Sequence, residues 1–277
     1  MDERFEREIE VNGLTFHVTV TGQGEPLLMI MGLGAPGDKW SPNVHAYARH
    51  FRCITFDNRG AGRSSKPEAE SYSTGEMALD AVSILDALDI KSAHINGVSM
   101  GGAIAQHIAI EHPQRVRSLI LTSTFASVST SFRRAIEVLK SSIGQLDPVT
   151  FKRLNQWMTF SQGFQNTREQ EMYAAERQDR AYPYPMPQYA YKAQCNACLS
   201  HNTAADLGKI KAPSLIAAGD CDLFVTMEKT MELYEGIPGS SLYLCRGGGH
   251  VHQWEQLEAY NQATLEFLLE HSGKGRA

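Results

Sequence analysis

The segment 93–112 limits what this chain can fold into more than any other stretch. A short apolar run, Ala93 to Val98, leads into Gly97-Val98-Ser99-Met100-Gly101, and apolar residues at helical spacing follow as far as His112. A G-x-S-x-G between a strand and a helix predicts a sharp turn that lifts a serine hydroxyl above the edge of a sheet. Glycines two residues before and after the serine allow the backbone to approach itself where a Cβ would clash. We predict that Ser99 is a catalytic nucleophile, the alternative being a plain strand–helix turn.

The composition is typical of a soluble globular enzyme. Of 277 residues, 42% are hydrophobic and 21% charged, which fits one large α/β domain with an insertion, or two small domains. The net charge of −5 predicts no nucleic-acid partner and no anionic membrane partner, and no apolar stretch reaches the roughly 18 residues that span a bilayer. The charged segment 1–8 lacks the apolar region of a secretory signal, so we expect a cytoplasmic protein. The composition allows a homo-oligomer as well as a monomer.

Strands and helices alternate along most of the chain. Two alternating runs, 5–11 and 14–21, flank Asn12-Gly13, which predicts a β-hairpin. Further strands are predicted at 26–31, 51–56, 93–98, 117–122, 214–218 and 241–245, and helices at 74–88, 100–112, 227–234 and 254–270. Such alternation predicts a mostly parallel, doubly wound sheet with helices on both faces.

The strand pattern disappears between about 125 and 201. This segment has helical patches, several aromatic residues and the stretch 182–187, whose alternating prolines favour an extended connection. We predict an α/β core formed by 1–124 and 206–277, with an inserted helical cap at 125–205. Trp157 in the cap is a candidate substrate-binding residue, although packing explains such aromatic residues equally well.

A nucleophilic serine needs a histidine base and an acid that orients the histidine. The loop after strand 214–218 offers Asp220 and Asp222, and we favour Asp222 because Asp220 lies next to the strand end. After strand 241–245, three glycines lead directly to His250.

The histidine loop and a cysteine pair allow other interpretations. His252 is the competitor of His250 as the base, and a metal site at His250-x-His252 has no further ligand cluster to complete it. The lone pair Cys195 and Cys198 is interpreted as structural, since no second pair accompanies it. We therefore expect no metal and no cofactor.

A tetrahedral intermediate needs two backbone N–H donors aimed at its oxyanion. We expect one from Met100, the residue after the nucleophile, and one from Leu33 in the glycine-containing loop 31–34. The segment 57–64 is interpreted as structural, with Asp57 and Arg59 fixing a tight turn beside the serine.

These motifs, in this order, resemble the α/β-hydrolase superfamily. The resemblance covers nearly the whole chain and rests on segments 31–34, 57–64, 97–101, 219–222 and 248–250. Segment 194–206, followed by 210–213, is similar to the branch of 3-oxoadipate enol-lactonases and related small cofactor-free hydrolases. Two departures are Met31-Gly32 where the family often has His-Gly, and His201-Asn202 where that branch usually has His-Asp.

The resemblance implies an acyl-enzyme mechanism, a substrate pocket between cap and sheet, and no cofactor. The leading hypothesis is a hydrolase of a carboxylic ester or lactone of a small molecule, with Ser99, Asp222 and His250 as the triad. An alternative uses the same triad to hydrolyse a carbon–carbon bond of a vinylogous diketone. A third hypothesis is a non-catalytic binding protein on the same fold.

Overall fold

A computed structural model describes residues 4–273, so the beginning of the charged segment 1–8 lies outside the described residues. Eight strands form one sheet in the order β1-β2-β4-β3-β5-β6-β7-β8. Their bounds are β1 (Arg4–Val11), β2 (Leu14–Thr21), β3 (Glu25–Ile30), β4 (Phe51–Phe56), β5 (Ala93–Val98), β6 (Val116–Thr122), β7 (Ser214–Gly219) and β8 (Ser241–Cys245). β2 runs antiparallel to β1 and β4, and the other neighbours are parallel. The predicted hairpin and mostly parallel sheet are confirmed.

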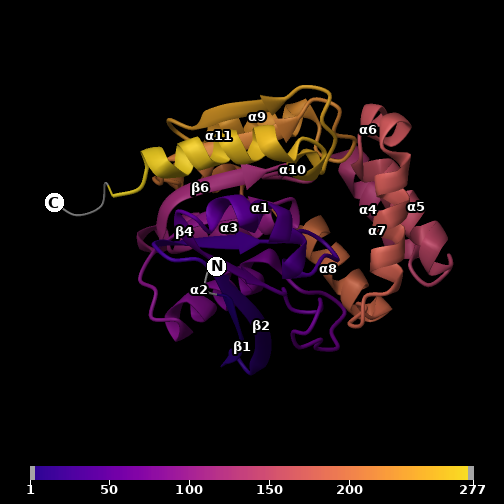
Figure 1. The fold of residues 1–277 in the computed structure, drawn as a ribbon, viewed down its shortest axis with the longest axis horizontal. Coiled ribbons are helices and arrows are strands. Elements are labelled where there is room, and N and C mark those ends of the chain that lie inside the picture. The colour runs from indigo at the N-terminus through magenta and orange to yellow at the C-terminus, as the bar shows by residue number, and fades with distance from the viewer. Residues whose placement is uncertain (1–3, 274–277) are drawn as a thin grey trace.

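Helices cover both faces of this sheet (Figure 1). The core helices are α1 (Ser41–Tyr47), α2 (Thr74–Ala87), α3 (Met100–Glu111), α9 (Met227–Gly236), α10 (His252–Glu255) and α11 (Leu257–Glu270), with short 3-10 turns η1 (Gly37–Trp40), η2 (Pro113–Arg115) and η3 (Ala204–Lys209). The predicted helix 254–270 is wrong in one respect. It is two helices, because the backbone leaves the helical region at Gln256 (φ −126°, ψ 52°).

Alternate side chains of β3 enter two separate apolar cores. Leu28 and Ile30 pack in the cluster that includes α2 and α3. Leu27 and Met29 pack in the cluster on the other face, with residues of α1 and α11. Successive residues of a strand point to opposite faces, so a continuous apolar run is required where helices cover both.

Five helices lie between β6 and β7 in the sequence. They are α4 (Thr130–Ser142), α5 (Pro148–Thr159), α6 (Gln162–Thr167), α7 (Glu169–Arg180) and α8 (Gln188–Ser200). Figure 1 shows α4 to α7 gathered at one end of the molecule. α8 carries seven buried residues, whereas α6 and α7 carry none, so α8 is the most deeply buried of these five helices. The cap bounds 125 and 205 stay a prediction.

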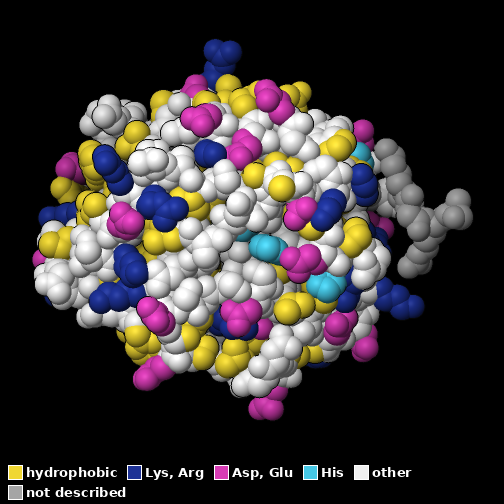
Figure 2. Space-filling view, turned by 180° about the vertical axis from the view of Figure 1, so that it is seen from behind, with side chains coloured by type: hydrophobic (Ala, Val, Ile, Leu, Met, Phe, Trp, Pro, Cys, Tyr) yellow, Lys and Arg dark blue, Asp and Glu magenta, His cyan; other side chains and the backbone are white. Residues whose placement is uncertain are grey.

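The surface carries charges of both signs. On the face seen in Figure 2, Lys and Arg side chains are interspersed with Asp and Glu. None of the helices in residues 4–273 combines the length and the apolar character needed to cross a membrane.

The side chain of Arg59 binds helix α2. Its guanidinium pairs with Asp80 of α2, at 2.7 and 2.9 Å, and Asn12 of the hairpin donates to the same carboxylate at 3.1 Å. The Asp80 side chain is 2% exposed. The pair therefore joins the loop after β4 to α2 and to the hairpin turn.

We expect Asp80→Ala to lower the free energy of unfolding by about 3 kcal/mol, because it leaves a largely buried guanidinium without its hydrogen-bonded partner and with only the more distant Glu76 carboxylate, at 3.8 Å. Urea denaturation measures this. The control is Asp86→Ala on the same helix, whose carboxylate is 64% exposed and pairs with Arg115; its expected change is within about 1 kcal/mol. Equal losses in the two variants would contradict the assignment.

Candidate active site

Ser99 occupies a strained turn between β5 and α3. Its backbone has φ 55° and ψ −119°, a conformation that a residue with a side chain rarely adopts. A Cβ on Gly97 would lie 2.3 Å from the oxygen of Gly101, and one on Gly101 would lie 2.1 Å from that of Ile30. Both glycines of the predicted motif are therefore required. In the stretch 93–106, Ser99 alone is partly exposed, so the turn presents this side chain outward.

Asp222 and His250 lie together at the same end of the sheet, in the loops that follow β7 and β8. Asp222 Oδ1 accepts from the backbone N–H groups of Phe224 and Val225 at 2.8 and 2.9 Å. Its Oδ2 lies 2.8 Å from His250 Nδ1, and both side chains are largely buried. A carboxylate can only accept, so Nδ1 carries the proton and Nε2 is left as the basic nitrogen.

The serine and the histidine are not joined in this structure. Among the described residues, the Ser99 hydroxyl makes no hydrogen bond, to His250 or to any other group. The site therefore contains the Asp222–His250 hydrogen bond and, apart from it, the partly exposed hydroxyl of Ser99. Catalytic hydrogen bonds are often long or absent before substrate binds.

The two less favoured candidates, His252 and Asp220, make other contacts. His252 is fully buried, and its Nδ1 lies 3.2 Å from the Ser123 hydroxyl and 3.3 Å from the carbonyl oxygen of Gly249. Burial lowers the pKa of His252 to about 4, which leaves it neutral at pH 7. Asp220 accepts from the N–H of Gly247 at 2.6 Å and joins the two loops.

The loop after β3 runs directly beside Ser99. A Cβ on Gly32 would lie 3.2 Å from that of Ser99, so the N–H of the next residue, Leu33, is close to the serine. Met100 is the first residue of α3, and the N–H of a first helical residue has no acceptor within the helix. The arrangement leaves both predicted oxyanion donors on the two backbone segments that flank the hydroxyl.

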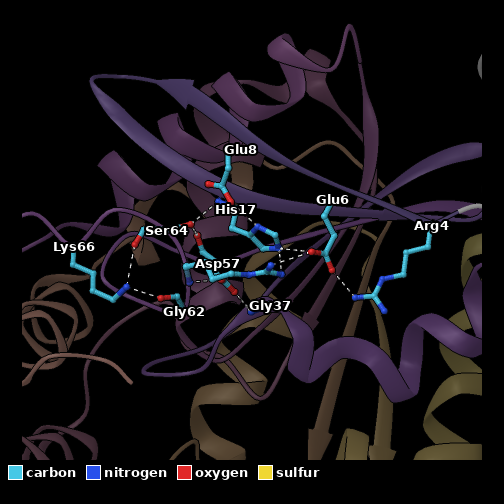
Figure 3. A network of polar contacts seen from close by, with 10 residues as sticks. Arg4, Glu6, Glu8, His17, Gly37, Asp57, Gly62, Ser64 and Lys66 are labelled. Carbon is cyan, nitrogen blue, oxygen red and sulfur yellow. Dashed lines mark hydrogen bonds and ion pairs between the residues drawn. The ribbon is translucent and has the colours of Figure 1, made fainter. Parts of the chain in front are cut away.

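Asp57 holds this loop in place, as Figure 3 illustrates. Its carboxylate accepts from the N–H of Gly37 and of Arg63, each at 2.7 Å. Ser64 donates to the carbonyl oxygen of Asp57 at 2.7 Å and accepts from the N–H of His17 at 2.9 Å. The interpretation of Asp57 as structural agrees with these contacts, which join β2, the loop after β4 and the loop beside Ser99.

Two residues that sequence reasoning missed tie the helical insertion to this site. Glu255 of α10 accepts from the N–H and hydroxyl of Ser161, at 2.7 and 2.8 Å, and from the N–H of Gly249 at 3.0 Å. Gln194 of α8 accepts from the N–H of Gly34 at 2.9 Å. Neither residue was predicted to contact the site, because Gly34 and Ser161, which they bind, lie far away in the sequence.

Trp157 and the cysteine pair lie on two helices of the insertion. Trp157 is on α5 with 59% of its surface exposed, and its role in substrate binding stays a prediction. Cys195 and Cys198 are buried on α8, and burial raises the pKa of both thiols. Within residues 4–273, no group of three or more His, Cys, Asp or Glu side chains is arranged to hold a metal ion.

Known proteins share this fold over nearly its full length. A family model described as alpha/beta hydrolase fold matches residues 25–257. The chain is 28% identical to RutD of Variovorax paradoxus (strain S110), assigned by name as a carbamate hydrolase, over 95% of this chain and 98% of RutD. Est816, described as an N-acyl homoserine lactone degrading enzyme, has a TM-score of 0.82 and 26% identity, over 94% of this chain and 100% of Est816. The enol-lactonase from Burkholderia xenovorans LB400 has a TM-score of 0.84 at 22% identity, over 95% of this chain and 100% of that one, which is a likeness of fold.

Gly249→Ala tests how the histidine loop is held. A Cβ there would lie 2.5 Å from the nitrogen of Ser161 and 2.7 Å from the oxygen of Thr159, so the loop must move. We expect the labelling of Ser99 by a fluorophosphonate to slow by about 100-fold, since a displacement of about 1 Å has that effect. Gly163→Ala on α6 is the control, because no atom of the described residues lies within 4 Å of its Cβ position and its φ is outside the left-handed region; equal labelling rates in the two variants would refute this.

Proposed function

This chain belongs to the α/β-hydrolase family, and we propose that it cleaves a carboxylic ester or lactone of a small organic molecule with Ser99, His250 and Asp222. The observation that carries the proposal is the pairing of a strained, outward-facing serine with a buried Asp222–His250 hydrogen bond of 2.8 Å at the same end of the sheet. A serine, a histidine and an orienting acid form the minimal set for acyl transfer.

In the first half-reaction, His250 Nε2 takes the proton of the Ser99 hydroxyl as Oγ attacks the substrate carbonyl. The carbonyl oxygen becomes an oxyanion, which the N–H groups of Leu33 and Met100 stabilise. His250 then gives its proton to the leaving alcohol, which departs and leaves an acyl-enzyme. Asp222 stays ionised throughout and is held in place by the N–H groups of Phe224 and Val225.

In the second half-reaction, His250 takes a proton from water and the resulting hydroxide attacks the acyl carbon. Collapse of this second oxyanion returns the proton to Ser99 Oγ and releases the acid. Each step uses only groups of this chain and water. In a lactone, the alcohol and the acid are parts of one product.

Est816 supports the choice of a carbonyl–oxygen bond, and RutD supports that of a carbonyl substrate. Est816 is described as degrading an N-acyl homoserine lactone, and RutD is named for carbamate hydrolysis. Both substrates contain a carbonyl that a serine hydroxyl can attack. The carbon–carbon hydrolase and the non-catalytic binding protein are the alternatives that the experiments below distinguish.

Ser99→Ala removes the nucleophile and leaves the turn intact. We expect the turnover of p-nitrophenyl butyrate to fall by about 10,000-fold, with the unfolding temperature unchanged because one partly exposed oxygen is lost. The control is Ser141→Ala, an exposed serine of α4, which should keep full activity. Retained turnover in Ser99→Ala would overturn the triad.

A substrate panel tests the bond that is cleaved. The turnover rates of a short ester, a γ-lactone and a vinylogous diketone by the unmutated protein are measured and compared. Faster turnover of the ester or lactone is expected, whereas preference for the diketone would favour the carbon–carbon hydrolase. A fluorophosphonate that fails to label Ser99 would instead favour the binding protein.

A further inference from the structure

Gln194 is a fully buried amide whose two polar atoms bind two different loops. It lies on α8, and its side chain is 0% exposed. Oε1 accepts from the N–H of Gly34 at 2.9 Å, and Nε2 donates to the carbonyl oxygen of Arg59 at 2.8 Å. One side chain of the helical insertion therefore joins the loop after β3 to the loop after β4, at the point where the first passes Ser99.

α8 is held against these loops by contacts other than Gln194. A Cβ on Gly34 would lie 2.8 Å from the ring of Tyr191, and one on Gly60 would lie 3.2 Å from the Cβ of Ala190. The carbonyl oxygen of Ala193 accepts from the N–H of Tyr72 at 3.2 Å. Loss of the Gln194 hydrogen bonds would thus leave the helix in place, and the effect would fall on the loops.

The loop beside Ser99 needs such support. Gly34 has φ +73°, which only glycine adopts readily, so the chain there has a wide choice of conformations. The Leu33 carbonyl and the Gly34 N–H share one planar peptide unit. The Leu33 N–H belongs to the preceding peptide unit, which is joined to this one only through the Leu33 Cα. A hydrogen bond to the Gly34 N–H fixes the Leu33–Gly34 unit and thereby restricts the directions in which the Leu33 N–H can point.

We propose that Gln194 is a positioning residue for the oxyanion hole: from α8 it fixes the Leu33–Gly34 peptide so that the Leu33 N–H points at the oxyanion. This inference rests on the proposed function, in which Leu33 stabilises the tetrahedral intermediate. The effect belongs to the transition state, because the oxyanion forms only there. Gln194 touches neither the substrate nor the reacting atoms.

Gln194→Met keeps the length of the side chain and removes both hydrogen bonds. With p-nitrophenyl butyrate, we expect kcat to fall by about 10- to 100-fold while KM stays within about threefold. The inhibition constant of phenylboronic acid, which forms a tetrahedral adduct with a reactive serine, should rise by a similar factor. Gln156→Met is the matched control. It removes a buried amide that donates to the carbonyl oxygen of Met172, away from both loops. This variant should leave kcat and the inhibition constant unchanged.

Gln194→Glu keeps the acceptor for the Gly34 N–H and should lose less than tenfold in kcat. If Gln194→Met does not fold, Gln194→Leu, which also removes both hydrogen bonds, takes its place with the same expected losses. Unchanged kcat and boronate affinity in Gln194→Met, or equal losses in the Met and Glu variants, would overturn the proposal. An active Ser99→Ala protein would instead overturn the proposed function, so the two failures are distinguishable.

Discussion

The close approach of three backbone segments at Ser99 is the constraint on which the rest of the site depends. β5, the first turn of α3 and the end of β3 meet at distances that leave no room for a Cβ at Gly97 or Gly101. Ser99 itself has a positive φ of 55°, and a non-glycine residue in that conformation costs about 1 to 3 kcal/mol. The end of β6 offsets this cost, because the carbonyl of Thr122 accepts from the Ser99 N–H at 2.9 Å and the Thr124 hydroxyl donates to the Ser99 carbonyl at 2.7 Å.

The loops that surround the serine are supported from two sides. From the sheet, Asp57 binds Gly37 and Arg63, while the Asn58 side chain donates to the carbonyl oxygen of Met31 at 2.9 Å. From the helical insertion, Gln194 binds Gly34 in the loop after β3. Ser161 binds Glu255, which in turn binds Gly249 in the histidine loop. The insertion is therefore part of the framework of the site as well as its neighbour.

Local sequence predicted most of the sheet and the pairing of Asp222 with His250, for physical reasons. Glycine turns, apolar runs and the order of loops after parallel strands are properties of neighbouring residues. The same reasoning did not identify Asp80 as the partner of Arg59, because Asp80 lies 21 residues away on α2. Gln194 and Glu255 were missed since their partners depend on how the insertion folds back. The break at Gln256 was missed because the apolar spacing continues through it.

The ties between the insertion and the histidine loop also bear on how substrate enters. Ser161 bonds to Glu255, and the N–H of Val251 donates to the carbonyl oxygen of Thr159 at 3.3 Å. If the insertion swung away as a rigid lid, these contacts would break and the histidine would lose its support. In an open molecule the histidine would be held by Asp222 without the insertion, so the serine would react more slowly than while the insertion is docked. Entry by the turning of individual side chains, with the helices fixed, would carry no such coupling between access and reactivity.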